Sequence, residues 1–297
     1  MLHPRFRSLL PAAVAALAAT ALSVGLTPTA SAAPEPLKPT VTLRESHVIH
    51  RGDAEMGWRS DVSPASAAST SSASASATAS ATATASASGI GSSGVNGMDV
   101  SRWQRTVNWD AWRAKGKSFA YVKATEGTSY TNRYFKAQYG GSRDAGMLHG
   151  AYHFASPNGS SGKAQAAYFV KHGGAWKADG KTLPGVLDIE YNPYGSTCYG
   201  LSKAAMVRWV TSFTKEYKAR TGRDAVIYTT NDWWKRCTGS SKAFNRTNPL
   251  WVARYSSSVG TLPGSWPFYT FWQYTASPLD QDHFSSSYAR LVSLARG

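Results

Sequence analysis

Two carboxylates one residue apart, Asp188 and Glu190, follow the apolar run at 183–187. If that run is a strand, side chains at positions i and i+2 point to the same face, with the two backbone positions roughly 6.6 Å apart. In a shared pocket, like charge and partial burial raise the pKa of one carboxyl, so one acid can donate a proton while the other stays ionised. Glycoside hydrolysis uses such a pair. For the tripeptide alone, a strand-end cap that pairs with nearby cations is the alternative.

The sequence around this pair alternates short apolar runs with longer amphipathic segments. Strands are expected at 97–101, 119–124, 150–155, 185–190, 225–229, 250–255 and 269–274. Helices are expected at 109–115, 132–145, 162–172 and 203–220. Alternating β and α units predict an α/β fold with a parallel sheet and right-handed crossovers, here closed into a β/α barrel. After Cys237 the helical signal fades, so we expect an irregular barrel with incomplete helices in its last third.

Side chains that could take part in catalysis or binding lie near the carboxyl ends of these strands, where parallel α/β barrels carry their active sites. They are Asp99, Lys123, Glu126, Tyr152, His153, Asp188, Glu190, Tyr228, Tyr255, Trp272, Gln273 and Asp280. Because aromatic faces stack on sugar rings and carboxylates bind hydroxyls, the group predicts a sugar-binding cleft. We interpret His153 as a hydrogen-bonded wall residue. Lys123 and Glu126 either pair with each other or contact the substrate.

The amino-terminal third has the composition of a leader and a linker. Arg5 and Arg7 precede an apolar stretch at 9–26 and the small residues at 30–32, which predicts a signal peptide over residues 1–33 and a secreted, extracellular protein. No other stretch is apolar enough to cross a bilayer. Residues 34–93 include an Ala/Ser/Thr-only tract at 65–88 and predict a disordered linker or a pro-region.

Residues 94–297 are long enough for one domain, which we expect to be catalytic and monomeric. The chain carries a net charge of +15, so anionic cell-wall polymers are expected partners. Nucleic acid is not expected, since no basic helix, zinc pattern or base-stacking motif accompanies the charge. No phosphate-binding glycine loop, Ser-His-Asp elbow or metal cluster occurs, so we expect no cofactor and no metal.

The two cysteines, Cys198 and Cys237, are an even number in an exported chain, which predicts one disulfide. Loop-closure entropy gives such a bridge roughly 4 kcal/mol of stabilisation. Neither cysteine has a CxxC partner or a nearby histidine, which argues against a metal site.

Six sequence blocks in order resemble the Chalaropsis-type lysozymes of glycoside hydrolase family 25, in its secreted bacterial branch. These blocks are GMDVSRWQ at 97–104, YVKATEG at 121–127, GAYHFA at 150–155, LDIE at 187–190, LWVARY at 250–255 and FWQY at 271–274. The resemblance covers essentially all of residues 94–297. It implies an irregular, flattened, TIM-like barrel and a disulfide like that of the bacterial branch.

The resemblance also implies hydrolysis of the β-1,4 bond between N-acetylmuramic acid and N-acetylglucosamine in bacterial peptidoglycan. It assigns Glu190 as the general acid, its pKa raised by Asp188 and aromatic neighbours, and places Asp188, Asp99 and Asp280 around the cleft. Asp282 takes the place of Asp280 if the register slips by two. Only residues 275–279 stand where the family usually has a longer loop, which trims one wall of the cleft.

Strand spacing alone does not determine the stereochemistry. One hypothesis is attack by the substrate's 2-acetamido oxygen, with Asp188 orienting the amide. The other is displacement by water activated by Asp99 or Asp280. A non-catalytic module that binds cell-wall glycans and a chitinase-like hydrolase remain alternative functions.

Overall fold

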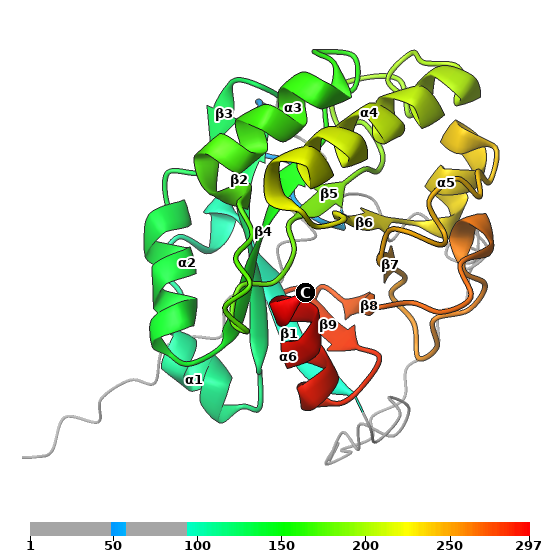
Figure 1. The fold of residues 1–297 in the computed structure, drawn as a ribbon. Helices are drawn as coiled ribbons and strands as arrows, with labels where there is room; N and C mark the ends of the chain where they lie inside the picture. The colour runs from blue at the N-terminus through cyan, green and yellow to red at the C-terminus, as the bar shows by residue number, and fades with distance from the viewer. Residues whose placement is uncertain (1–48, 58–93) are drawn as a thin grey trace, which may run out of the picture. The chain divides into compact units, whose positions relative to one another are not determined.

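Eight strands close into a mixed barrel (Figure 1). The computed structural model describes residues 49–57 and 94–297, so the predicted signal peptide and most of the predicted linker lie outside the described residues. The barrel strands are β1 (Val95–Val100), β2 (Phe119–Glu126), β4 (Leu148–Phe154), β5 (Val186–Asp188), β6 (Val226–Thr229), β7 (Leu250–Ala253), β8 (Phe271–Thr275) and β9 (Gln281–Phe284). The first seven of these run parallel. The last, β9, is antiparallel to both β1 and β8 and completes the closure.

Helices cover the outside of the barrel over its first two thirds (Figure 1). They are α1 (Trp109–Ala114), α2 (Phe135–Asp144), α3 (Gly162–Phe169), α4 (Lys203–Thr221) and α5 (Asn231–Thr238). A last helix, α6 (Tyr288–Arg296), follows β9 and packs Leu291 and Ala295 against interior residues of the strands. Between β7 and β8 there is only a 3-10 turn at Pro263–Ser265. The predicted irregular α/β barrel is therefore confirmed. A short strand, β3 (Tyr130–Thr131), extends the edge of β2.

Successive side chains along each strand point alternately to the barrel interior and to the helix layer. Interior aromatic residues form one apolar cluster, which includes Phe119, Tyr121, Tyr152, Tyr228, Trp251 and Phe271. Outward residues such as Leu187 and Val252 share a second cluster with Phe169 and Phe213 of the covering helices. The Ser202 hydroxyl caps α4 by accepting from the backbone N–H of Ala205.

Several elements of the structure, the short strand β3 among them, were not predicted from the sequence. The helices α5 and α6 were not predicted, although Thr230 and Ser287 cap their first turns with side-chain oxygens. The strand β9 was not predicted either, because its residues 281–284 are mostly polar and show no apolar alternation. These polar side chains are buried by closure of the barrel, which no local pattern reveals.

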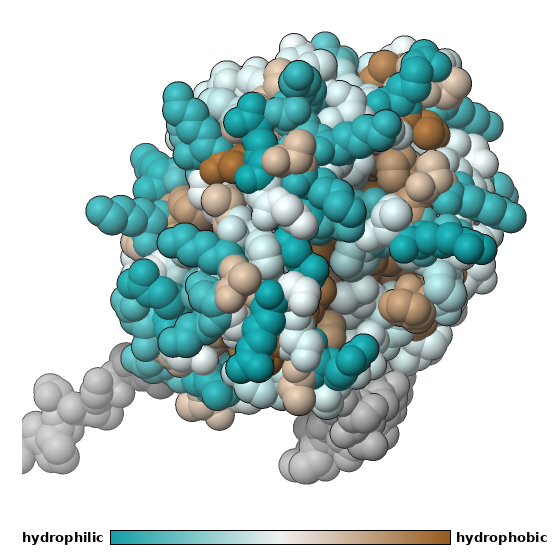
Figure 2. Space-filling view, viewed as in Figure 1, coloured by the Kyte–Doolittle hydropathy of each residue, from teal (hydrophilic) through white to brown (hydrophobic). Residues whose placement is uncertain are grey.

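Cys198 and Cys237 form the predicted disulfide, which joins the loop after β5 to the last turn of α5. The exposed faces of α2, α3 and α4 carry basic side chains that include Lys136, Lys163, Arg208 and Lys215. Figure 2 shows the corresponding face of the molecule with hydrophilic side chains spread across it. Within the described ranges, no helix combines the length and the apolar character needed to cross a bilayer.

Candidate active site

The end of β5 presents Asp188 and Glu190 to one side. Leu187 and Ile189 face the helix layer, whereas Val186 belongs to the interior cluster, so the acids share the interior side. The Ile189 N–H donates to the Tyr228 carbonyl at 3.0 Å, which continues the strand pairing past the last strand residue. Both acids are buried, with 1% and 0% of their surfaces exposed. The strand interpretation of this pair is therefore correct.

A buried hydrogen-bond chain beside the pair links side chains of β6, β8 and β1, three strands that are not adjacent in the sheet. The Tyr228 hydroxyl donates to Oε1 of Gln273 at 2.6 Å, and Nε2 of Gln273 donates to Oδ2 of Asp99 at 2.7 Å. The Tyr255 hydroxyl lies 3.3 Å from the same Oε1. Because Gln273 is held from both sides, its amide fixes the orientation of the Asp99 carboxylate.

Burial is the main electrostatic influence on the acids at this rim. It raises the pKa of Asp99 well above the ordinary value, and the charge of Asp282 adds to the shift. Burial also raises the pKa of Asp188, against the opposing charge of Lys123. Taking a carboxylate out of water disfavours its charged form, so burial at this rim favours the protonated form of both acids.

The two candidate acids near β9 occupy different depths. Asp280 directly precedes β9, and the pairing of Met98 with Gln281, continued by one residue, sets Asp280 opposite Asp99. Since β9 is antiparallel, its start lies at the same rim as the carboxyl ends of the parallel strands. Asp282 pairs with Gly97 further inside the barrel. Its pKa is raised by burial and by the charge of Asp280.

Lys123 and Glu126 pair with each other at the end of β2. Their Nζ and Oε2 atoms are 2.7 Å apart, and neither side chain is exposed. The Tyr194 hydroxyl donates to the other Glu126 oxygen at 2.6 Å. The ion pair is not the only contact of these two residues at the rim, because each also forms a hydrogen bond with residues 49–57.

The predicted aromatic residues divide between the two faces of the barrel wall. Tyr152 and Tyr228 are fully buried on the interior side, and Tyr255 is half-buried beside Gln273. Trp272 does not join them, since it belongs to the outer cluster and its indole N–H donates to the Arg254 carbonyl at 2.9 Å. The expectation that Trp272 lines the cleft fails because β8 directs alternate residues to opposite faces.

His153 has the wall position that the sequence suggested. Its ring nitrogens lie 2.7 Å from Thr125 Oγ1 and 2.9 Å from Gln165 Oε1, and it stacks against Phe213. Burial lowers its pKa to about 3. The imidazole is therefore neutral at physiological pH and fully occupied by its partners.

The structure adds residues 49–57 to this site, which we call the strap. Gly57 reaches Glu190, and Glu55 reaches Ser101 at the end of β1. Sequence reasoning left this segment inside the predicted linker or pro-region, because its nine residues, most of them polar or small, show no helix or strand period. No local sequence pattern indicates that its two glycines and Met56 contact the barrel.

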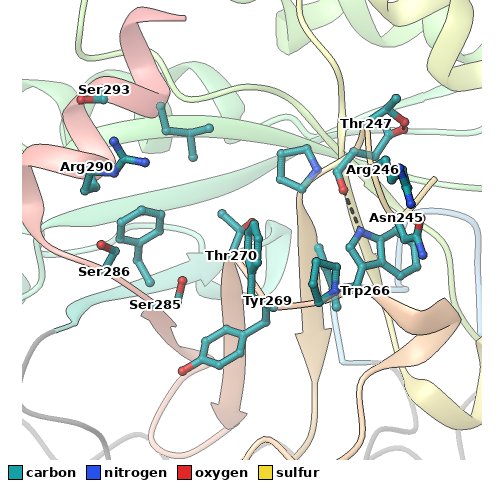
Figure 3. A pocket seen from close by; sticks show the side chains of 17 residues that line it. Asn245, Arg246, Thr247, Trp266, Tyr269, Thr270, Ser285, Ser286, Arg290 and Ser293 are labelled. Carbon is teal, nitrogen blue, oxygen red and sulfur yellow. Dashed lines mark hydrogen bonds between the residues drawn. The ribbon is translucent and has the colours of Figure 1, made fainter.

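A second pocket of about 740 Å³ lies at the opposite end of the barrel (Figure 3). It borders the start of β7, the end of β9 and one side of α6, with Trp266, Tyr269 and Arg290 among its lining residues. Its lining includes no carboxylate, so it is not a candidate for acid catalysis.

Among the described residues, no cluster of three or more His, Cys, Asp or Glu side chains could hold a metal ion.

Residues 98–283 match the family described as glycosyl hydrolases family 25. The chain belongs to this family. The family 25 chain is 51% identical over 212 residues to lysozyme M1 of Streptomyces globisporus, covering 69% of this chain and 72% of that protein. It is 49% identical over 183 residues to an N,O-diacetylmuramidase of Chalaropsis sp, covering 60% of this chain and 87% of the other.

The fold agrees with this assignment. A solved bacterial lysozyme from Streptomyces coelicolor aligns with a TM-score of 0.68 and 51% identity, covering 69% of this chain and 98% of that one. The family resemblance expected from the six sequence blocks is therefore confirmed, and the chain is a family 25 glycoside hydrolase. The strap lies outside the family match, which begins at residue 98.

The raised pKa values make the stability of this family 25 barrel sensitive to pH. An acid with a folded pKa above its unfolded value of about 3.9 holds its proton more tightly when folded, so stability is lost as pH rises through the folded pKa. We expect Asp282→Asn to reduce the fall in melting temperature between pH 4 and pH 8. Thermal unfolding across this range measures it, with exposed Asp144→Asn as the matched control. An unchanged slope in Asp282→Asn contradicts the assignment.

Proposed function

We propose that this family 25 hydrolase is a muramidase that cleaves the β-1,4 bond between N-acetylmuramic acid and N-acetylglucosamine in bacterial peptidoglycan. The observation that carries the proposal is the buried pair Asp188 and Glu190 at the end of β5, with Asp99 of β1 near enough for the Asp188 charge to contribute to its raised pKa. Relatives that share about half of their aligned residues with this chain are named lysozyme and N,O-diacetylmuramidase.

Glu190 is the proposed general acid, which protonates the leaving glycosidic oxygen as an oxocarbenium-like centre develops. Asp188 on the same face orients the substrate's 2-acetamido group, whose oxygen attacks the anomeric carbon. Asp99 and Asp280 stabilise the positive charge, and water activated by either of them is the alternative nucleophile. Gln273 supports Asp99 through its hydrogen bond.

The remaining rim residues are proposed to bind the glycan. Tyr152, Tyr228 and Tyr255 supply ring faces and hydroxyls on the interior side, and Lys123 with Glu126 supplies charged hydrogen-bonding groups at the end of β2. Trp272 is left out because it faces the helix layer.

We also propose that the protein is secreted and acts as a monomer. The basic leader with its apolar stretch and the disulfide support an exported protein. A net charge of +15 suits attraction to anionic wall polymers, which weakens as salt increases.

Digestion of purified peptidoglycan by residues 94–297 tests the proposal. This segment forms the closed barrel, and the solved Streptomyces coelicolor lysozyme corresponds to it over 98% of that chain. Released fragments are reduced and analysed by mass spectrometry, and we expect new reducing ends on N-acetylmuramic acid. Reducing ends on N-acetylglucosamine indicate a different hexosaminidase. Binding to walls without any release indicates a non-catalytic module.

A further inference from the structure

The strap fills the rim where the catalytic acids converge. Residues 52–57 are all buried, with Ala54 at 0%, Met56 at 1% and Glu55 at 5% exposure. Met56 belongs to the interior aromatic cluster that contains Tyr152 and Tyr228. A segment that precedes the family domain in sequence is thus packed into the mouth of its barrel.

The carboxyl-terminal end of the strap bonds the proposed acid directly. The Gly57 N–H donates to Oε1 of Glu190 at 2.9 Å, and this bond is buried. Two residues before Gly57, Oε2 of Glu55 accepts from the Ser101 hydroxyl at 2.7 Å. The strap therefore occupies one of the two carboxyl oxygens of the proposed general acid.

The amino-terminal end of the strap is held by the charged pair of β2. Lys123 Nζ donates to the carbonyl oxygens of Gly52 and Ala54, and Oε2 of Glu126 accepts from the Gly52 N–H at 3.0 Å. Next to this, Asp53 pairs with Arg102, and its carbonyl accepts from Nε1 of Trp103 at 2.8 Å. The strap's polar atoms thus bond side chains at the end of β2 and just beyond β1.

Two glycines of the strap lie so close to rim side chains that no Cβ atom would fit at either position. A Cβ on Gly57 would lie 2.1 Å from the Tyr255 hydroxyl and 2.9 Å from Oε1 of Gln273, and a Cβ on Gly52 would lie 2.1 Å from the Tyr130 ring. Both residues have positive φ, at +83° and +96°, which side chains disfavour. Such a close fit is expected of a ligand that occupies its site, and not of a chain that passes over it.

We propose that the strap is an autoinhibitory segment, a tethered ligand that excludes glycan from the cleft until the chain is cut between the strap and the barrel. Peptide groups and acetamido groups share an amide N–H and a carbonyl, so backbone amides can take the hydrogen-bonding places of N-acetyl sugars. The identity of the excluded ligand as a glycan rests on the proposed function, whereas the exclusion itself rests on the contacts of residues 49–57.

The covalent link through residues 58–93 explains how weak individual contacts can block the cleft. Intramolecular binding gives a ligand an effective concentration on the order of millimolar, so modest affinity suffices for nearly full occupancy. When an endoprotease hydrolyses a peptide bond between Gly57 and Gly94, that advantage is lost and the freed peptide dissociates on dilution. The cut changes no residue of the barrel.

The test uses the full chain with a site-specific protease sequence inserted in the Ala/Ser/Thr tract at 65–88. Two readouts are followed before and after cutting and dilution: peptidoglycan hydrolysis, and carbodiimide labelling of the Glu190 carboxyl measured by mass spectrometry. We expect cutting to raise hydrolysis at least tenfold and to raise Glu190 labelling in parallel. Excess synthetic peptide 49–57 should reverse both changes.

Gly57→Ala in the uncut chain is the decisive variant. Its Cβ cannot fit beside Tyr255, so we expect hydrolysis and Glu190 labelling to approach the cut level without cutting. Gly116→Ala is the matched control, because Gly116 also has positive φ, at +86°, but open space around its Cβ position. It should leave the uncut chain inhibited. After cutting and dilution, Gly57→Ala and wild type should be equally active, since the variant residue is outside the barrel segment.

The two readouts separate this inference from the proposed function. Equal Glu190 labelling before and after cutting overturns the strap as a plug, whatever the enzyme hydrolyses. Increased labelling with unchanged, measurable hydrolysis overturns inhibition. Increased labelling with no hydrolysis by either form supports occlusion of the cleft by the strap and rejects the muramidase.

Discussion

Glu190→Gln in residues 94–297 should lower kcat for peptidoglycan hydrolysis by about 10²–10⁴-fold, the range that positioned general acids contribute. Gln keeps the size of Glu and an oxygen that can accept a hydrogen bond, but its amide cannot deliver an acidic proton to the leaving oxygen. KM should change little, because the ground-state contacts at the rim remain. Initial rates on purified walls, with circular dichroism to verify the fold, measure this effect.

The matched control for that substitution is Glu216→Gln. Glu216 lies on α4, away from the rim, where it pairs with Arg220 at 2.6 Å. Surface pairs of this kind contribute little, so activity and fold should both be retained. If Glu190→Gln keeps full activity while Glu216→Gln also does, the proton donor is another rim acid, and Asp99 is the first to examine because burial raises its pKa.

The part of this site that the sequence predicts best is the part governed by strand periodicity. Asp188 and Glu190 share a face because alternation along β5 continues through Ile189, whose N–H still bonds Tyr228. The same rule, applied to β8, would have placed Trp272 opposite Gln273 and kept it out of the cleft. That error came from grouping neighbours in sequence without asking which face each one takes.

The parts that the sequence could not predict depend on contacts between distant segments. Strand β9 is polar, and Asp282 is buried only because β9 closes the barrel between β1 and β8. The strap has no periodic pattern at all. Glu55 and Gly57 form their hydrogen bonds with Ser101 and Glu190, residues 46 and 133 positions away. Closure and occupation of a cleft are tertiary events, and local sequence carries little information about them.

Replacing both Cys198 and Cys237 by Ala should lower the free energy of unfolding by about 4 kcal/mol, because the bridge closes a loop across 39 positions and restricts the unfolded chain. Cys237 is fully buried in the outer cluster together with Trp233 and Trp234, so Ala is preferred to Ser, which would add a buried hydroxyl. Guanidinium unfolding of residues 94–297 at neutral pH measures the loss.

Reduction of the wild-type barrel supplies the control for this double variant. If the loss comes from the unfolded chain, reduced wild type and the Ala variant should unfold at the same guanidinium concentration, apart from the small packing cost of removing two sulfur atoms. The bridge lies between the loop after β5 and α5, outside the hydrogen-bond chain of Tyr228, Gln273 and Asp99. Activity of the folded variant at low temperature should therefore match wild type. A loss below about 1 kcal/mol, or an inactive but folded variant, would mean that the bridge acts on the native cleft and not on the unfolded chain.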